Sequence, residues 1–185
     1  MRRLAPPQII GDDAEFREDG VHRYWLSRRV APEGPVGLFL ALNPSTAGAI
    51  GDDATVRKWK GFARRWGWSG FWVGNLFTFI ETKSARLREL ASYHVCDDAS
   101  DKVLIAMLQR APEVVLCWGN NVPKHLSSRI GAVLDLLQEH QPTGASVSTF
   151  GLSKSGQPMH PLMLSYETPR QRYVFTKRTS RRDSE

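Results

Sequence analysis

Short apolar runs alternate along this chain with longer segments that have helical periodicity. Mostly apolar runs at residues 36–42, 71–77 and 113–119 are typical of strands buried on both faces of a sheet. Residues 146–150 predict a fourth strand, and the pattern at 22–30 predicts an edge strand. The chain therefore contains enough strand segments for one central sheet.

Apolar residues at helical spacing predict helices between these strands. One helix begins after Asp52 and Asp53, which are good N-cap residues, and ends near Gly67. The same spacing predicts helices over residues 84–92, 98–110 and roughly 123–139. Because strands and helices alternate, we expect an α/β fold with three layers, α/β/α, around a central and mainly parallel four-stranded sheet.

Length and composition indicate one globular domain. The chain has 185 residues, of which 41% are hydrophobic. We expect the domain to span residues 1–172 and a disordered basic tail to occupy residues 173–185. No apolar run is long enough to cross a membrane, and the segment from Met1 to Pro7 lacks the apolar core of a signal peptide. These features predict a cytoplasmic protein with no membrane partner.

The cysteines and histidines do not form a metal-binding pattern. Cys96 and Cys117 match no zinc spacing, and the five histidines include no His-x-x-x-His pair. A disulfide is not expected in a reducing compartment. We therefore expect no metal and no cofactor.

Positive charge is concentrated in two places. The formal net charge is +6, and residues 170–185 contribute six Arg or Lys against two acids, which is 6 − 2 = +4. The second group lies on the helix predicted after Asp53, mostly away from its apolar stripe: Arg57, Lys58, Lys60, Arg64 and Arg65. Basic clusters attract nucleic acids by releasing counterions, and a solvated surface is the alternative explanation.

Polar side chains follow several of the predicted strands. Asn43, Asn75 and Asn120 come after the first three central strands, and His160 follows the last. The carboxyl ends of parallel strands meet at one edge of a sheet, where open α/β proteins bind their ligands. Individually, an Asn before a proline is often a turn residue, Asn75 could satisfy strand-end backbone groups, and His160 could lie in a surface loop. Their occurrence together predicts a crevice lined by amides and an imidazole.

Four segments resemble, in order, the motifs of the uracil-DNA glycosylase superfamily. They are Leu42-Asn43-Pro44, Asn75-Leu76-Phe77-Thr78, Leu116-Cys117-Trp118-Gly119 and His160-Pro161-Leu162. The resemblance spans residues 36–168. The chain looks still closer to a group of uncharacterised bacterial and phage proteins, domain of unknown function 1643, with Leu-Asn-Pro-Ser-Thr-Ala, Asp-Asp-x-Thr and Asn-Leu-Phe signatures.

The resemblance implies a monofunctional DNA glycosylase that acts on a flipped base without a cofactor. It implies that Asn43 positions or activates water beneath the sugar, that Asn75 binds the base edge, and that His160 donates to the departing base. Further implied substrate contacts are Leu42, Ser45, Phe77 and Asn120, and implied DNA contacts are Arg57, Lys58, Arg64, Leu162, Met163 and Ser165.

Three departures from the superfamily motifs affect the expected chemistry. Asn43 replaces an Asp and cannot accept a proton, so we expect slow turnover. Because that carboxylate is missing, Asp52 and Asp53 stay open: each could cap the helix, or one could face the pocket and replace the carboxylate. Ser45 stands where uracil-specific enzymes carry a Tyr, which leaves room for a 5-substituted pyrimidine. The loop from His160 to Ser165 differs from the superfamily's loop, so its wedge residue stays open.

The sequence thus predicts a monomeric glycosylase that removes an unusual or 5-modified pyrimidine from duplex DNA, in repair or anti-phage defence. Two alternatives remain open. One is a nucleic-acid-binding module without catalysis. The other is an N-glycosidase of a free nucleoside or nucleotide, for which DNA binding would be weak and insensitive to salt.

Overall fold

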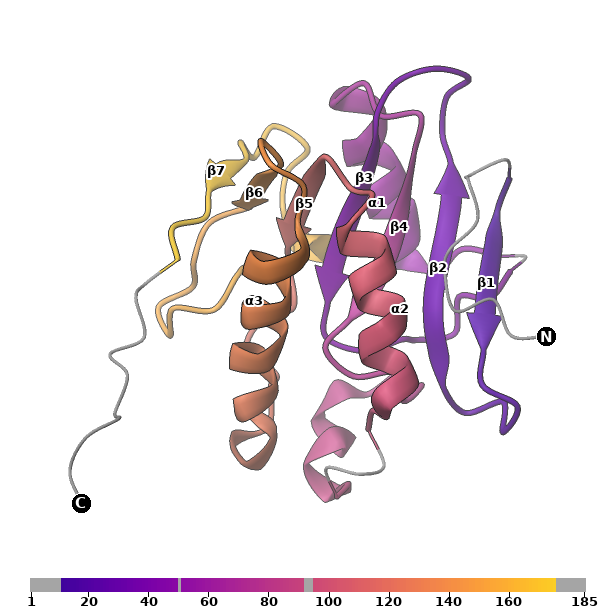
Figure 1. Cartoon of the computed structure of the whole chain (residues 1–185), viewed down its shortest axis with the longest axis vertical. Helices are drawn as coiled ribbons and strands as arrows, with labels where there is room; N and C mark the ends of the chain where they lie inside the picture. The colour runs from indigo at the N-terminus through magenta and orange to yellow at the C-terminus, as the bar shows by residue number, and fades with distance from the viewer. Residues whose placement is uncertain (1–10, 50, 92–94, 176–185) are drawn as a thin grey trace.

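The computed structural model describes residues 11–49, 51–91 and 95–175, and these residues form one seven-stranded sheet (Figure 1). The strand order is β1-β2-β4-β3-β5-β6-β7. The strands are β1 (Asp13–Phe16), β2 (Arg23–Arg29), β3 (Val36–Ala41), β4 (Gly70–Asn75), β5 (Glu113–Leu116), β6 (Ser146–Thr149) and β7 (Gln171–Arg172).

The sheet is mixed. β3 pairs in parallel with β4 and β5, and β5 pairs in parallel with β6. β1, β2 and β7 pair antiparallel with their neighbours. The α/β fold class is confirmed, but the sheet has seven strands and is not the predicted four-stranded sheet. The prediction of an edge strand at 22–30 is also wrong, because β1 covers the outer side of β2.

The helices largely follow the predicted segments. They are α1 (Ala54–Arg65), α2 (Asp98–Leu108) and α3 (Ser128–His140), with short 3₁₀ helices η1 (Ser84–Glu89), η3 (Lys124–Leu126) and η4 (Pro161–Met163). The segment predicted as a helix over 84–92 is only the 3₁₀ helix η1, and residue 92 lies outside the described residues. The helix expected over 123–139 is divided into η3 and α3.

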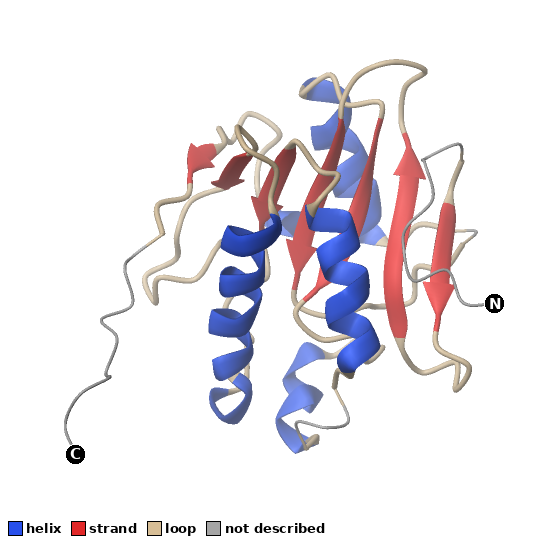
Figure 2. Cartoon of the chain, in the orientation of Figure 1, coloured by secondary structure: helices blue, strands red, loops and turns tan. Residues whose placement is uncertain are grey.

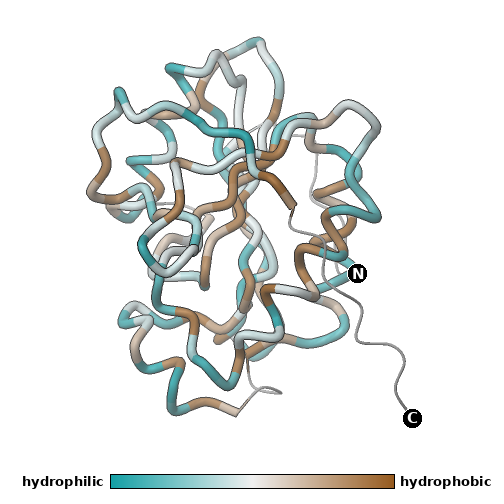
Figure 3. Tube along the Cα trace, turned by 90° about the vertical axis from the view of Figure 1, so that its left-hand side faces the viewer, coloured by the Kyte–Doolittle hydropathy of each residue, from teal (hydrophilic) through white to brown (hydrophobic). Residues whose placement is uncertain are grey.

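The helices cover both faces of the sheet, with α1 on one face and α2 and α3 on the other (Figure 2). Side chains of β3 alternate between the two cores: Phe39 packs with α1, and Leu38 and Leu40 pack with α2 and α3. In Figure 3 the apolar positions follow the central strands, and polar positions occupy the outer loops. This arrangement leaves the carboxyl ends of β3 and β5 between the helical layers.

The C-terminal segment joins the sheet through β7, which pairs antiparallel with β6. The backbone N–H of Tyr173 donates to the Val147 carbonyl at 2.9 Å, and the ring of Tyr173 contacts that of Phe175. The rest of the predicted tail, residues 176–185, lies outside the described residues. Within the described part of the chain, no helix is long and apolar enough to cross a membrane.

Candidate functional site

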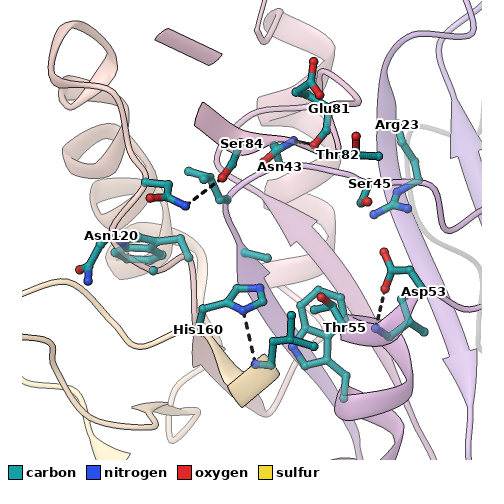
Figure 4. A pocket seen from close by; sticks show the side chains of 18 residues that line it. Arg23, Asn43, Ser45, Asp53, Thr55, Glu81, Thr82, Ser84, Asn120 and His160 are labelled. Atoms are coloured by element: carbon teal, nitrogen blue, oxygen red, sulfur yellow. Dashed lines mark hydrogen bonds between the residues drawn. The ribbon is translucent and has the colours of Figure 1, made fainter. Parts of the chain in front are cut away.

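A pocket of about 360 Å³ opens at the carboxyl ends of β3 and β5 (Figure 4). Its walls come from the segment after β3, the start of α1, the segment after β5 and the loop before η4. Seven of the residues predicted for the site line it: Leu42, Asn43, Ser45, Asp53, Asn120, His160 and Leu162. The topology therefore brings together residues that are more than a hundred positions apart in the sequence, as the strand-end argument predicts.

Asn75 and Phe77 are not among the residues that line this pocket. The chain continues to pair with β3 beyond Asn75, since the N–H groups of Leu76 and Phe77 donate to the carbonyls of Ala41 and Leu42 at 2.9 Å. Asn75 is consequently buried, and neither its amide nitrogen nor its amide oxygen has a hydrogen-bond partner. Phe77 lines a second cavity of about 280 Å³ with Val95, Leu126 and others.

The predicted DNA contacts lie outside the pocket, except for Leu162. Arg57, Arg64 and Ser165 are exposed, and Met163 is 90% exposed. Lys58 lies with its ammonium 3.9 Å from the centre of the Tyr166 ring. The three apolar residues of η4 contact the basic helix α1.

Asn43 has both a structural role and a free acceptor. Its Nδ2 donates to the carbonyls of Pro44 and Glu81 at 2.9 and 2.8 Å. These bonds hold the segment after β3 against the segment after β4. Because both amide hydrogens are engaged, only Oδ1 remains to accept a bond from a ligand or a water molecule.

Asp53 serves as a cap and as a pocket residue at once. It is the N-cap of α1, and its Oδ1 accepts from the Val56 N–H at 2.8 Å. The same carboxylate lines the pocket (Figure 4). Both roles considered for Asp53 are therefore compatible with its position, because a carboxylate has a second oxygen that can accept bonds.

His160 presents a neutral imidazole to the pocket. Its Nδ1 accepts from the Leu162 N–H at 3.4 Å, which leaves the hydrogen on Nε2. Burial lowers the pKa of His160 below its ordinary value of 6.5, and the charge of Asp53 partly opposes this shift. At neutral pH the ring is consequently a hydrogen-bond donor without a positive charge.

The segment after β5 positions the loop that carries His160. Gly119 has φ of 74°, and a Cβ atom there would lie 3.1 Å from the His160 Cβ. The Gly119 N–H donates to the Pro158 carbonyl at 2.8 Å. Next to it, the Oδ1 of Asn120 accepts from the hydroxyls of Ser153 and Ser155 at 2.7 and 2.9 Å. Asn120 therefore has its amide hydrogens available to a ligand.

Several pocket residues were not predicted from the sequence. They are Arg23, Thr55, Glu81, Thr82, Ser84 and Asn121, together with apolar lining from Trp59 and Trp118. Arg23 had a recognisable signal, because a charged residue directly precedes the apolar sequence Tyr24-Trp25-Leu26 of a buried strand.

A second buried arginine of β2, Arg28, fixes the wall that contains Ser45 and Asp53. Its Nε is 2.7 Å from Oδ1 of Asp52, and its Nη2 donates to the carbonyls of Gly48 and Gly51 at 2.6 and 2.9 Å. Burial raises the pKa of Asp52, but hydrogen bonds from Lys60 and Arg28 outweigh it and lower the pKa overall. The segment before α1 is thus held by an ion pair.

No cluster of three or more His, Cys, Asp or Glu side chains that could hold a metal ion occurs within residues 11–49, 51–91 and 95–175. The pocket offers amide, hydroxyl, carboxylate, imidazole and guanidinium groups to a ligand. This mixture of donors and acceptors suits an organic molecule with several polar groups.

Fold and site together define an α/β protein with a polar ligand pocket at the carboxyl ends of its parallel strands. The chain belongs to the DUF1643 family, described as proteins of unknown function, whose model matches residues 23–162. The matched range begins at Arg23 and ends at Leu162, so it includes every residue that lines the pocket. No curated protein and no solved structure matches the chain. The resemblance to this family is confirmed, and the relation to uracil-DNA glycosylases stays a prediction.

Proposed function

We propose that the protein is a DNA glycosylase that hydrolyses the N-glycosidic bond of an unusual or 5-modified pyrimidine. The observation that carries the proposal is that a neutral imidazole, His160, and a carboxylate, Asp53, line one small pocket. Pockets for small ligands start at about 300 Å³, so a cavity of about 360 Å³ suits a single nucleoside unit.

The two groups fit the two charges that develop when the bond between sugar and base breaks. The electron pair of that bond leaves with the base, and the Nε2–H of His160 donates to the resulting anion. Water supplies the new bond to the sugar carbon, and Asp53 accepts the proton that the water loses. The Oδ1 of Asn43 accepts the second hydrogen of this water and orients it.

Features around the pocket support a duplex as the substrate. Leu162 and Met163 are exposed apolar residues at the rim and beside it, which is the character of side chains that fill the gap left by a flipped base. Arg57 and Arg64 of α1 are exposed cations that could contact phosphates. The small side chain of Ser45 in the wall leaves space for a substituent on the pyrimidine.

The proposal is tested with duplexes that carry uracil, a thymine mismatch, or hydroxymethylated or glucosylated cytosine. We expect the wild-type protein to create abasic sites in at least one of them. His160→Ala and Asp53→Asn should each lower the single-turnover rate by about a hundredfold or more, because each removes a transition-state interaction.

Two matched variants control for stability. Asp97→Asn changes the aspartate that caps α2, and His125→Ala removes a histidine that lines the cavity beside Phe77. Both should retain the wild-type rate. Base release that survives in His160→Ala and Asp53→Asn, or that is lost equally in the controls, would contradict the assigned roles.

A free nucleotide is the second candidate substrate, and the buried cation Arg23 in the pocket wall favours it. If a free nucleotide is the substrate, the protein would release the base from a nucleoside monophosphate, and its activity would not fall steeply as the salt concentration rises. A module that binds nucleic acid without catalysis would release no base from either substrate.

A further inference from the structure

Arg23 is a buried cation in the wall of the pocket. Its side chain belongs to β2, is 2% exposed as a residue, and lines the cavity. Figure 4 shows its guanidinium on the same side of the pocket as Ser45 and Asp53, with Asn120 and His160 on the opposite side. Arg23 therefore lies away from the group expected to bind the departing base.

The guanidinium is only partly satisfied within the protein. Its Nη1 donates to the Ala47 carbonyl, and its buried Nε has no hydrogen-bond partner. No carboxylate among the described residues lies within 4.0 Å of it, whereas the neighbouring Arg28 pairs with Asp52 at 2.7 Å. A buried charge without a close counter-charge is costly unless another partner supplies one.

The surrounding electrostatics agree with this geometry. Burial lowers the pKa of Arg23 to about 10, and the nearby charge of Arg28 acts in the same direction, while Asp53 opposes both. The group stays protonated at neutral pH and remains a cation. An anion that enters this side of the pocket would therefore gain a charge-assisted bond that the protein itself does not provide.

A purely structural role for Arg23 explains less of the arrangement. Its single bond to the Ala47 carbonyl could hold the segment after β3, but Arg28 already holds that segment through the carbonyls of Gly48 and Gly51. A structural arginine would also be expected to have a partner at Nε, as Arg28 has in Asp52.

We propose that Arg23 forms an anion subsite that binds a phosphate group of the substrate, so that the pocket takes a nucleotide and not a neutral nucleoside. The proposal rests on the proposed function for the identity of the nucleoside part. The phosphate could belong to a free nucleoside monophosphate or to a DNA strand, and both offer the same oxygens to the guanidinium.

The test compares the binding of thymidine, thymidine 5′-monophosphate and a short thymidine oligonucleotide by calorimetry at low salt. We expect the wild-type protein to bind at least one phosphorylated ligand about ten- to a hundredfold more tightly than thymidine, as for one charge-assisted contact. Arg23→Gln should abolish this preference, and Arg23→Lys should retain part of it. Preference for the monophosphate indicates a free nucleotide, and preference for the oligonucleotide alone indicates a DNA phosphate.

Asp53→Asn provides a second variant in case Arg23→Gln does not fold. It keeps an N-cap residue but removes the negative charge near Arg23, so the phosphorylated ligand should bind several-fold more tightly. Asp97→Asn, which alters the cap of α2, should leave the affinity unchanged. An increase in affinity for the phosphorylated ligand in both Asp53→Asn and Asp97→Asn, or in neither of them, would contradict the proposed anion subsite.

The result separates this inference from the proposed function. Equal affinity of the wild-type protein for thymidine and both phosphorylated ligands would overturn the subsite, even if base release is observed. A phosphate preference that depends on Arg23, without base release from any substrate, would keep the subsite and overturn the glycosylase.

Discussion

At the scale of single residues, the pocket joins side chains whose charges influence one another. His160 is kept neutral by burial, while Asp53 partly opposes that effect and also acts on Arg23. The carboxylate thus acts on both the donor for the base, His160, and the cation for an anionic group, Arg23. Its second function as the N-cap of α1 fixes its position by the backbone of the helix.

The protonation of His160 gives a prediction that does not depend on function. Its imidazole should titrate below 6.5 in the folded protein, and Asp53→Asn should lower this pKa further because the variant removes the opposing charge. Ring resonances followed by NMR against pH measure both values. A pKa of His160 at or above 6.5 would show that burial does not dominate.

The same shift has a consequence for stability. As the pH falls through about 6.5, His160 binds a proton in the unfolded chain before it does so in the folded protein. The contribution of neutral His160 to stability is therefore present above that pH and is lost below it. His160→Gln should show a weaker loss of thermal stability between neutral pH and pH 5 than the wild type. An identical pH dependence in both proteins would contradict this assignment.

Single residues differed in how well the sequence predicted them. Asn43, Asp53 and His160 follow strand ends or begin a helix, and both patterns are visible in the chain. Asn75 has the same pattern, but continued pairing beyond β4 buries it. Arg23 is the first residue of β2, and its charge beside an apolar run is visible in the sequence, but only the fold brings it to the cavity. Local sequence identifies strand ends, whereas the direction of a side chain depends on pairing between distant segments.

At the scale of elements, α1 and the loop around η4 form one wall of the site. Tyr166 packs directly on Gly61 in the middle of α1, where an added Cβ would lie 2.4 Å from Cε1 of the tyrosine ring. Lys58 and Arg65 lie over that ring, 3.9 and 4.2 Å from its centre. This contact fixes the loop that carries His160 relative to the helix that Asp53 caps.

A double-mutant cycle tests this contact. Gly61→Ala should destabilise the wild-type protein, because the methyl group displaces Tyr166. In a Tyr166→Ala background the same change should stabilise by about 0.5–1 kcal/mol, since alanine is the better helix former. Thermal or denaturant unfolding of the four proteins gives the coupling. If Gly61→Ala changes the stability in the same direction in both backgrounds, the packing of Tyr166 on Gly61 is contradicted.

At the scale of the whole molecule, the apolar runs predicted the inner strands well, and the outer strands were missed. β1 alternates polar and apolar residues but is only four residues long, and β7 consists of two polar residues, so neither is long enough to mark a strand in the sequence. They form because the edges of the sheet offer unpaired backbone groups. The predicted fold class therefore holds, while the size of the sheet depends on pairing that composition does not encode.

A glycosylase function requires that the assembled pocket release a base from DNA. The most direct measurement incubates the protein with genomic DNAs that carry different natural pyrimidine modifications and detects free base by mass spectrometry. We expect release of one modified pyrimidine by the wild-type protein, with matching abasic sites, and none by His160→Ala. Failure of the folded wild-type protein to release base from any of these DNAs, or equal release by His160→Ala, would contradict it.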